Sequence, residues 1–258
     1  GIYFWLRFLE LNTKKLFLVS IGLFILSMYS YQAPRLVVPL FIFGSVILQR
    51  KWHKKWKLWL LGLILSFILY FPVITLFSQP ASYHRSLGVS LLTSQQQLPG
   101  YSTQLGDWQK LYLIPREFLA LYLQYFSPYN LFWQGDYNRQ REVIGFSSFY
   151  FWLLPFLLVG IWTFFKNTSY LKKIILLWLL IAPLPASITT DPFHTYRALF
   201  TFLPISILIG LGVSQIIEFR KSIHKLIYSG FLNLMFVSVT VYFFSLLAVT
   251  PSARWRDW

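Results

Sequence analysis

The sequence predicts an all-α, polytopic integral membrane protein, on the strength of three observations. Of its 258 residues, 56% are hydrophobic and only 12% are charged, whereas soluble domains carry about 25% charged residues. Apolar segments of roughly 20 residues, the length that crosses a hydrocarbon core of about 30 Å, recur along the whole chain. Basic residues gather in every second connection between these segments.

The apolar pattern predicts about seven complete transmembrane helices after an N-terminal remnant at residues 1–9. We expect the spans at 16–33, 35–50, 58–77, 148–165, 173–188, 196–217 and 226–248. The chain opens inside an apolar segment and stops just after another one. We therefore interpret residues 1–258 as a single transmembrane domain fragment, an internal or C-terminal piece of a longer protein.

The basic connections orient the predicted helices. By the positive-inside rule, four connections face the cytoplasm, namely those with Arg7, Lys14 and Lys15, with Arg50, Lys51, Lys54, Lys55 and Lys57, with Lys166, Lys172 and Lys173, and with Arg220, Lys221 and Lys225. The connections at 31–35, 78–147, 189–195 and 249 onward then face outward. Because the charge of +15 is explained by this orientation, we expect no nucleic-acid partner.

The connection at 78–147 is the long outer loop. Near its end, Pro115 followed by Arg116 and Glu117 is typical of a helix start, and the residues after it are rich in Leu, Phe and Tyr. This helix is too short and too interrupted to span a bilayer. We expect it to lie in the outer interface with its aromatic side chains at headgroup depth.

The segment DPFHTYR, residues 191–197, packs ionisable residues between two apolar runs. Asp191 followed by Pro192 predicts a helix cap with proline at the first helical position. His194 and Arg197 would then lie on one side of the first helical turns. The N–H groups and the positive dipole end of a helix N-terminus bind anions, so we expect an anion site at the outer face.

A second outward helix start carries Arg35 directly after Pro34. We expect Arg35 and Arg197 to converge on one phosphate, because a guanidinium binds phosphate oxygens in pairs. The simpler alternatives are that both arginines reach lipid headgroups, that His194 is a hydrogen-bonded interfacial residue and that Asp191 only caps a helix.

The sequence also excludes several kinds of chemistry. It has no cysteine and no HExxH, GxSxG, Walker or dinucleotide motif. Every acidic residue falls at or beyond the end of a predicted span. The prolines fall mainly near span ends, although Pro39 and Pro155 lie inside spans. The four histidines are scattered, which favours no metal site. Nothing requires a cofactor, and dependence on a divalent metal is left open.

Four segments carry a resemblance to a known family: YSYQAPRLVVPL at 29–40, SYHRSLGVS at 82–90, PYNLFWQGD at 128–136 and WLLIAPLPASITTDPFHTYRALFTFLPISILIGLGV at 178–213. They resemble bacterial membrane glycosyltransferases of the GT-C fold, family 39-like relatives of protein O-mannosyltransferases and lipid A aminoarabinose transferases. The resemblance covers nearly the whole chain, and PASITTDPFHTYR is its most distinctive part.

The resemblance implies hexosyl transfer from a polyprenyl-phosphate-linked sugar donor to a protein, lipid or glycan acceptor, at the outer face of a bacterial plasma membrane. It implies that Arg35, His194 and Arg197 hold the donor phosphate. The general base of this family lies in an earlier outer loop, so we expect it upstream of Gly1 and expect no catalytic residue in this chain. Membrane lipids are the other expected partners. The alternative is a lipid-linked sugar transporter, or flippase, or a non-catalytic membrane scaffold.

Overall fold

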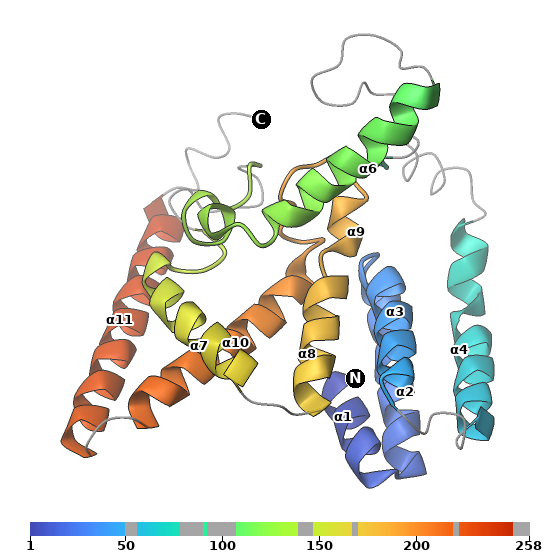
Figure 1. The fold of residues 1–258 in the computed structure, drawn as a ribbon, viewed down its shortest axis with the longest axis horizontal. Helices are drawn as coiled ribbons and strands as arrows, with labels where there is room; N and C mark the ends of the chain where they lie inside the picture. Colours follow the sequence, from blue (N-terminus) through green and yellow to red (C-terminus); the bar gives the residue numbers. More distant parts are fainter. Residues whose placement is uncertain are drawn as a thin grey trace. The chain divides into compact units, whose positions relative to one another are not determined.

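A computed structural model of the chain describes residues 1–49, 56–77, 90–91, 107–138, 147–166, 170–218 and 222–249 (Figure 1). Residues 50–55 and 219–221, in two of the predicted cytoplasmic connections, lie outside the described residues. So do residues 78–89, 92–106 and 139–146 of the predicted outer loop, and the residues after 249. The chain divides into two units. Unit 1 holds Gly1–Phe126 and Ser169–Thr201, and unit 2 holds Ser127–Thr168 and Phe202–Trp258.

The described residues are helical, and their only β pairing is an isolated antiparallel bridge between Ser90 and Thr189. Unit 1 contains α1 (Ile2–Leu11), α2 (Lys14–Ser30), α3 (Pro34–Ile47), α4 (Trp56–Phe77), α6 (Asp107–Gln124), α8 (Tyr170–Ile181) and α9 (Leu184–Ser187). Unit 2 contains a π-helix (Asn130–Gln134), a 3₁₀-helix (Phe151–Leu153), α7 (Leu154–Lys166) and α11 (Ser222–Val249). Helix α10 (Leu199–Glu218) begins in unit 1 and continues into unit 2. The all-α class is confirmed over this part of the chain.

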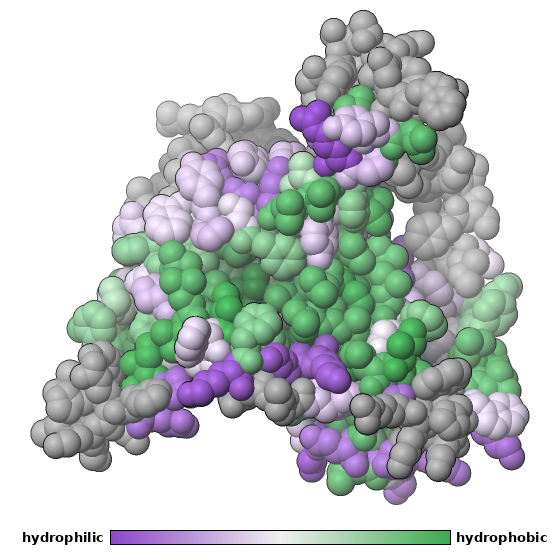
Figure 2. Space-filling model, in the orientation of Figure 1, coloured by the Kyte–Doolittle hydropathy of each residue, from purple (hydrophilic) through white to green (hydrophobic). Residues whose placement is uncertain are grey.

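Each predicted span coincides with a helix, but two of the described helices are long and apolar enough to cross a membrane. They are Tyr170–Ser187, which joins α8 and α9, and Leu199–Glu218, which is α10. Shorter apolar helices occupy the places of four other predicted spans, at Pro34–Ile47, Trp56–Pro72, Phe151–Lys166 and Gly230–Ser245. The count of seven complete spans stays a prediction. Figure 2 shows apolar residues over the middle of the helices and hydrophilic residues gathered near helix ends.

The helix expected to begin at Pro115 begins earlier, at Asp107, and contains Pro115 in its interior. That prediction was wrong because the sequence does not distinguish a proline at the first position of a helix from a proline inside one. An interior proline lacks the N–H that would bond to the carbonyl of the fourth residue before it. Proline also lies inside α3, α4 and α10, at Pro39, Pro72 and Pro204. Pro155, by contrast, is in the first turn of α7.

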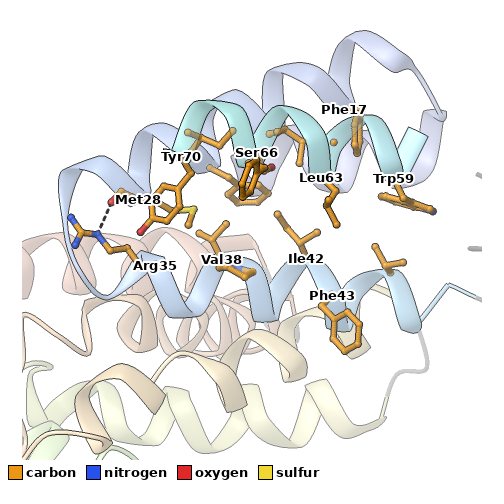
Figure 3. A pocket seen from close by; sticks show the side chains of 17 residues that line it. Phe17, Met28, Arg35, Val38, Ile42, Phe43, Trp59, Leu63, Ser66 and Tyr70 are labelled. Atoms are coloured by element: carbon orange, nitrogen blue, oxygen red, sulfur yellow. Dashed lines mark hydrogen bonds between the residues drawn. The ribbon is translucent and has the colours of Figure 1, made fainter. Parts of the chain in front are cut away.

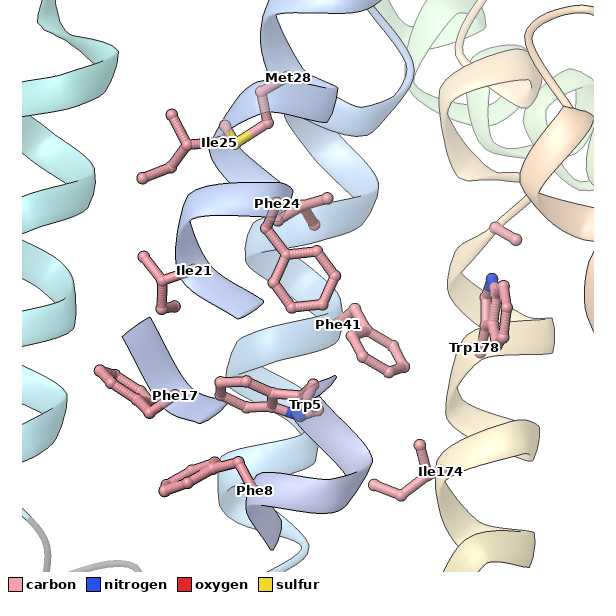
Figure 4. Close-up of a cluster of buried hydrophobic side chains, with 12 residues drawn as sticks. Trp5, Phe8, Phe17, Ile21, Phe24, Ile25, Met28, Phe41, Ile174 and Trp178 are labelled. Atoms are coloured by element: carbon pink, nitrogen blue, oxygen red, sulfur yellow. The ribbon is translucent and has the colours of Figure 1, made fainter. Parts of the chain in front are cut away.

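Unit 1 is built on a cluster of large side chains where α1 folds back on α2. Asn12 ends α1 in the left-handed conformation, with φ of 56°, and its N–H donates to the carbonyl of Phe8 at 2.8 Å. Trp5 and Phe8 are fully buried against α2 (Figure 4). The indole N–H of Trp5 donates to the hydroxyl of Ser45 in α3 at 3.0 Å, so this buried donor is paired. The cluster joins α1, α2 and α3, and Trp178 of α8 belongs to it.

In unit 2, helices α7 and α10 pack together at small residues and not at large side chains. A Cβ added to Gly160 of α7 would lie 1.8 Å from the carbonyl oxygen of Leu208 in α10, and one added to Gly212 would lie 1.8 Å from the carbonyl oxygen of Phe156. The two helix backbones are therefore in direct contact at these glycines. Close crossings at small residues are typical of helix pairs in membranes, where packing replaces the hydrophobic effect as the force between helices.

Candidate functional site

The chain between α9 and α10, residues 188–198, forms a series of turns that we call the His194 turn. Helix α10 begins at Leu199, so Asp191 does not cap it, and that prediction was wrong. The reason is the backbone of Phe193, which has a φ of 41°. A left-handed residue two positions after Asp191 cannot belong to the first turn of a right-handed α-helix.

His194 closes the turn that precedes α10, through two of its own acceptors. Its carbonyl oxygen accepts from the N–H of Ala198 at 3.1 Å, and its ring Nδ1 accepts from the N–H of Arg197 at 3.4 Å. A side-chain acceptor for the N–H three residues on is the usual geometry of a cap. Since Nδ1 is an acceptor, the neutral ring carries its proton on Nε2.

Asp191, His194 and Arg197 are brought together in this turn. A guanidinium nitrogen of Arg197 lies 3.4 Å from a carboxylate oxygen of Asp191, and Nε2 of His194 lies 3.9 Å from the same oxygen. The side chains of His194 and Arg197 are 9% and 19% exposed, whereas that of Asp191 is 44% exposed. The carboxylate of Asp191 balances the positive charge of Arg197, and both side chains are partly exposed.

Tyr125, directly after α6, holds the His194 turn in place. Its hydroxyl accepts a hydrogen bond from the backbone N–H of His194 at 2.8 Å. Its ring stacks on Phe193, with centroids 5.3 Å apart and planes at 22°, and both rings are almost completely buried. The strained conformation of Phe193 is thus fixed by a contact with a residue far away in the sequence.

A second contact fixes the beginning of the same turn. The N–H of Leu91 donates to the carbonyl of Ile188 at 2.8 Å, next to the bridge between Ser90 and Thr189. Close by, the hydroxyl of Tyr122 in α6 donates to the carbonyl of Leu180 at 2.8 Å. Burial raises the pKa of Tyr122, which keeps this donor protonated. We predicted that the aromatic residues of this helix lie at headgroup depth. The linear pattern gives no signal for the contact of Tyr125 with the turn or of Tyr122 with α8.

Arg35 lies elsewhere in unit 1. It is in the first turn of α3, and its Nε donates to the carbonyl of Met28 in the last turn of α2 at 3.0 Å. It also lines a cavity of about 530 Å³ between α2, α3 and α4, which we call the Arg35 pocket. No residue of the His194 turn lines this pocket. The structure therefore brings His194 and Arg197 together but does not place Arg35 in a common pocket with them.

The described residues contain no group of three or more His, Asp or Glu side chains that could hold a metal ion. One acid is buried: Asp136 in unit 2 is 5% exposed, and its carboxylate accepts from the N–H of Asn138 at 2.9 Å. That bond closes a turn within the chain, a common role for aspartate in loops. Asp136 was not among the predicted site residues, because its place in a predicted loop gives no sign of its burial.

Comparisons of the chain with protein families, with curated proteins and with solved structures find no match. The candidate site therefore has to be interpreted from its own chemistry. It offers one guanidinium in a largely buried setting, one imidazole with a defined tautomer and one partly exposed carboxylate.

Proposed function

We propose that the chain is the donor-binding part of a membrane glycosyltransferase that takes a sugar from a polyprenyl-phosphate donor at the outer face of the membrane. The observation that carries this proposal is the placement of Arg197 and His194 side by side in a turn that Tyr125 holds from α6. These bonds fix the backbone that carries the guanidinium of Arg197. A guanidinium is suited to a phosphate, because its planar N–H groups match two phosphate oxygens at once.

The membrane setting is supported by the apolar surface of the helices. Besides the two helices long enough to span, α4 exposes a large set of apolar side chains, namely Trp56, Leu60, Leu61, Leu63, Ile64, Phe67, Ile68, Leu69 and Phe71. An apolar surface of this extent is unfavourable in water and favourable in lipid. We propose that the helices of the chain span the membrane several times, as the alternation of basic loops indicates.

The charge of the site bears on how a phosphate would be held. Asp191 already pairs with Arg197, so a bound phosphate would compete with this carboxylate for the guanidinium. A sugar joined to a polyprenyl phosphate is a phosphodiester and carries a single charge. When the bond from the sugar to the phosphate breaks, the leaving phosphate gains negative charge, and Arg197 would stabilise it more strongly than the bound donor.

The acceptor hydroxyl must lose a proton in this reaction, and we propose that a carboxylate upstream of Gly1 accepts it, as general base. The acids of this chain are not needed for that step. His194 would contribute its Nε2–H as a donor near the phosphate, and its Nδ1 would keep the N–H of Arg197 in place.

The test is Arg197→Gln in the natural full-length protein, with release of polyprenyl phosphate from a polyprenyl-phosphate hexose as the readout. Loss of one such stabilising group costs about 10²- to 10³-fold in rate. The matched control is Arg7→Gln, since Arg7 is half exposed in a surface ion pair with Glu10 and should leave the rate unchanged. Normal turnover by correctly inserted Arg197→Gln protein would refute the proposal.

A second candidate is a transporter of a lipid-linked sugar, or a scaffold without chemistry. The observation that favours it is the proline inside each of α3, α4 and α10, because interrupted helices are frequent at transport sites. Movement of a lipid-linked sugar across vesicles that contain the protein, with no release of polyprenyl phosphate, would select this candidate.

A further inference from the structure

The Arg35 pocket is a feature of unit 1 that the proposed function does not use. It lies between α2, α3 and α4, and 17 residues line it (Figure 3). Most of them are apolar, among them Ile21, Ile25, Val38, Ile42, Phe43, Val46, Trp59, Leu63 and Phe67. A cavity with such a lining binds hydrocarbon in preference to water.

The polar groups of the pocket are few, and the charged one is at one end. Arg35 and Tyr70 lie together at that end, with Met28 beside them, and Ser66 lies farther along (Figure 3). None of the described residues that line the pocket is acidic, and Arg35 is the cationic side chain among them. A ligand that matches this arrangement has a long apolar chain and one negative charge at its end.

We propose that the Arg35 pocket binds an anionic glycerophospholipid of the surrounding bilayer, with one acyl chain in the pocket and the phosphate at Arg35. The pocket lies within three predicted spans, so bilayer lipid reaches it directly. A sugar headgroup would need several hydrogen-bond partners, and the pocket has two hydroxyl side chains, Ser66 and Tyr70, besides the arginine. This separates its ligand from the sugar donor proposed for the His194 turn.

Arg35 also has a structural role, which the experiment must separate from lipid binding. The bond from its Nε to the carbonyl of Met28 satisfies one of the last carbonyls of α2, where a cation is favourable. A purely structural Arg35 would change the stability of the protein equally with and without lipid. A lipid-binding Arg35 changes the increment that an anionic lipid adds.

The measurement is the shift in melting temperature of the whole purified chain, in neutral detergent, on titration with phosphatidylglycerol, phosphatidylcholine or polyprenyl phosphate. Two variants change the pocket: Arg35→Gln removes the charge, and Ser66→Phe fills the apolar part. Each has a control outside the pocket. Lys15→Gln removes an exposed charge at the start of α2, and Ile68→Phe adds the same ring on the exposed face of α4.

We expect phosphatidylglycerol to stabilise the wild type more than phosphatidylcholine does. Arg35→Gln should weaken phosphatidylglycerol binding about tenfold, the effect of one charge-assisted contact, and should abolish the preference between the two lipids. Ser66→Phe should abolish the shift with both lipids, and the two control variants should keep it. If Arg35→Gln is too unstable to purify, loss of the shift in Ser66→Phe, with retention in Ile68→Phe, carries the test.

Equal shifts with the two phospholipids, or an unchanged preference in Arg35→Gln, would overturn the proposal. So would a shift with polyprenyl phosphate that exceeds the shift with phosphatidylglycerol and is lost in Ser66→Phe, because the pocket would then belong to the donor. Sugar transfer reports on Arg197 and not on this pocket, so the failure of one proposal is distinguishable from the failure of the other.

Discussion

The Arg35 pocket and the His194 turn belong to the same unit but are assembled in different ways. The described residues that line the pocket come from three consecutive helices, between Phe17 and Tyr70. The His194 turn takes its shape from Tyr125 and from the segment at Leu91, both far from it in sequence. The first region is a local product of neighbouring helices, and the second exists only when distant parts of the chain meet.

The two arginines also differ in the group that each one contacts. Arg35 donates to a neutral backbone carbonyl, and none of the described residues that line its pocket is acidic. Arg197 faces the carboxylate of Asp191, so its turn is close to neutral. A cation in an apolar pocket attracts an anionic headgroup without discrimination of its shape, whereas a paired cation in a fixed turn binds an anion that competes with the carboxylate.

Of the variants that change one region and not the other, Tyr125→Ala is expected to lower the stability of the protein most. Removal of a buried aromatic ring costs about 3 to 5 kcal/mol, and the N–H of His194 loses the hydroxyl that accepts its hydrogen bond. Thermal unfolding in detergent should show a large drop, and the Arg35 pocket should still bind lipid. Tyr112→Ala, at a tyrosine that is 71% exposed, is the control. Equal destabilisation by the two variants would show that Tyr125 has no special role in the turn.

A smaller loss of stability, at the Arg35 pocket and not at the His194 turn, is expected for Gly62→Ala in the wall of that pocket. A Cβ at Gly62 would lie 2.5 Å from Cζ of Phe17, which is buried in the core of unit 1. Overpacking of this kind costs about 1 to 3 kcal/mol.

The matched control for Gly62→Ala is a substitution that should raise the stability of the protein. Gly22 in α2 is exposed, and a Cβ there has nothing within 4 Å, so Gly22→Ala should stabilise the helix by up to about 1 kcal/mol. Unfolding midpoints of the two variants measure both effects. A stabilised Gly62→Ala protein would mean that Phe17 moves freely and that the pocket wall is not rigid.

The smallest effect concerns pH and Tyr122. Because burial raises its pKa in the folded protein, the hydroxyl stabilises the fold fully below the unfolded pKa of about 10. Its contribution is lost as the pH rises from there through the raised folded value. Melting temperatures between about pH 9 and 11 should fall less steeply in Tyr122→Phe than in the wild type. An identical slope would show that other tyrosines dominate the alkaline loss of stability.

Sequence patterns predicted the helices of this chain better than the contacts between them. Helix α3 begins at Pro34 as the outward proline indicated, and α10 lies over the predicted span 196–217. The start of α6 and the cap at Asp191 were wrong. In both cases a local start signal, proline near acidic or basic residues, was placed correctly in sequence but was overridden by the conformation of neighbouring residues.

What the sequence determined by itself is the helical class, the positions of the apolar helices and the concentration of ionisable residues near Arg197. These follow from the length of apolar runs and from turn residues, which act over a few positions along the chain. Only the tertiary structure decided that His194 closes the turn before α10, that Asp191 pairs with Arg197 and that Arg35 lies in a pocket of its own. The stacking of Tyr125 on Phe193 selects the left-handed backbone of the turn, and a contact between residues so far apart leaves no periodic trace in the sequence.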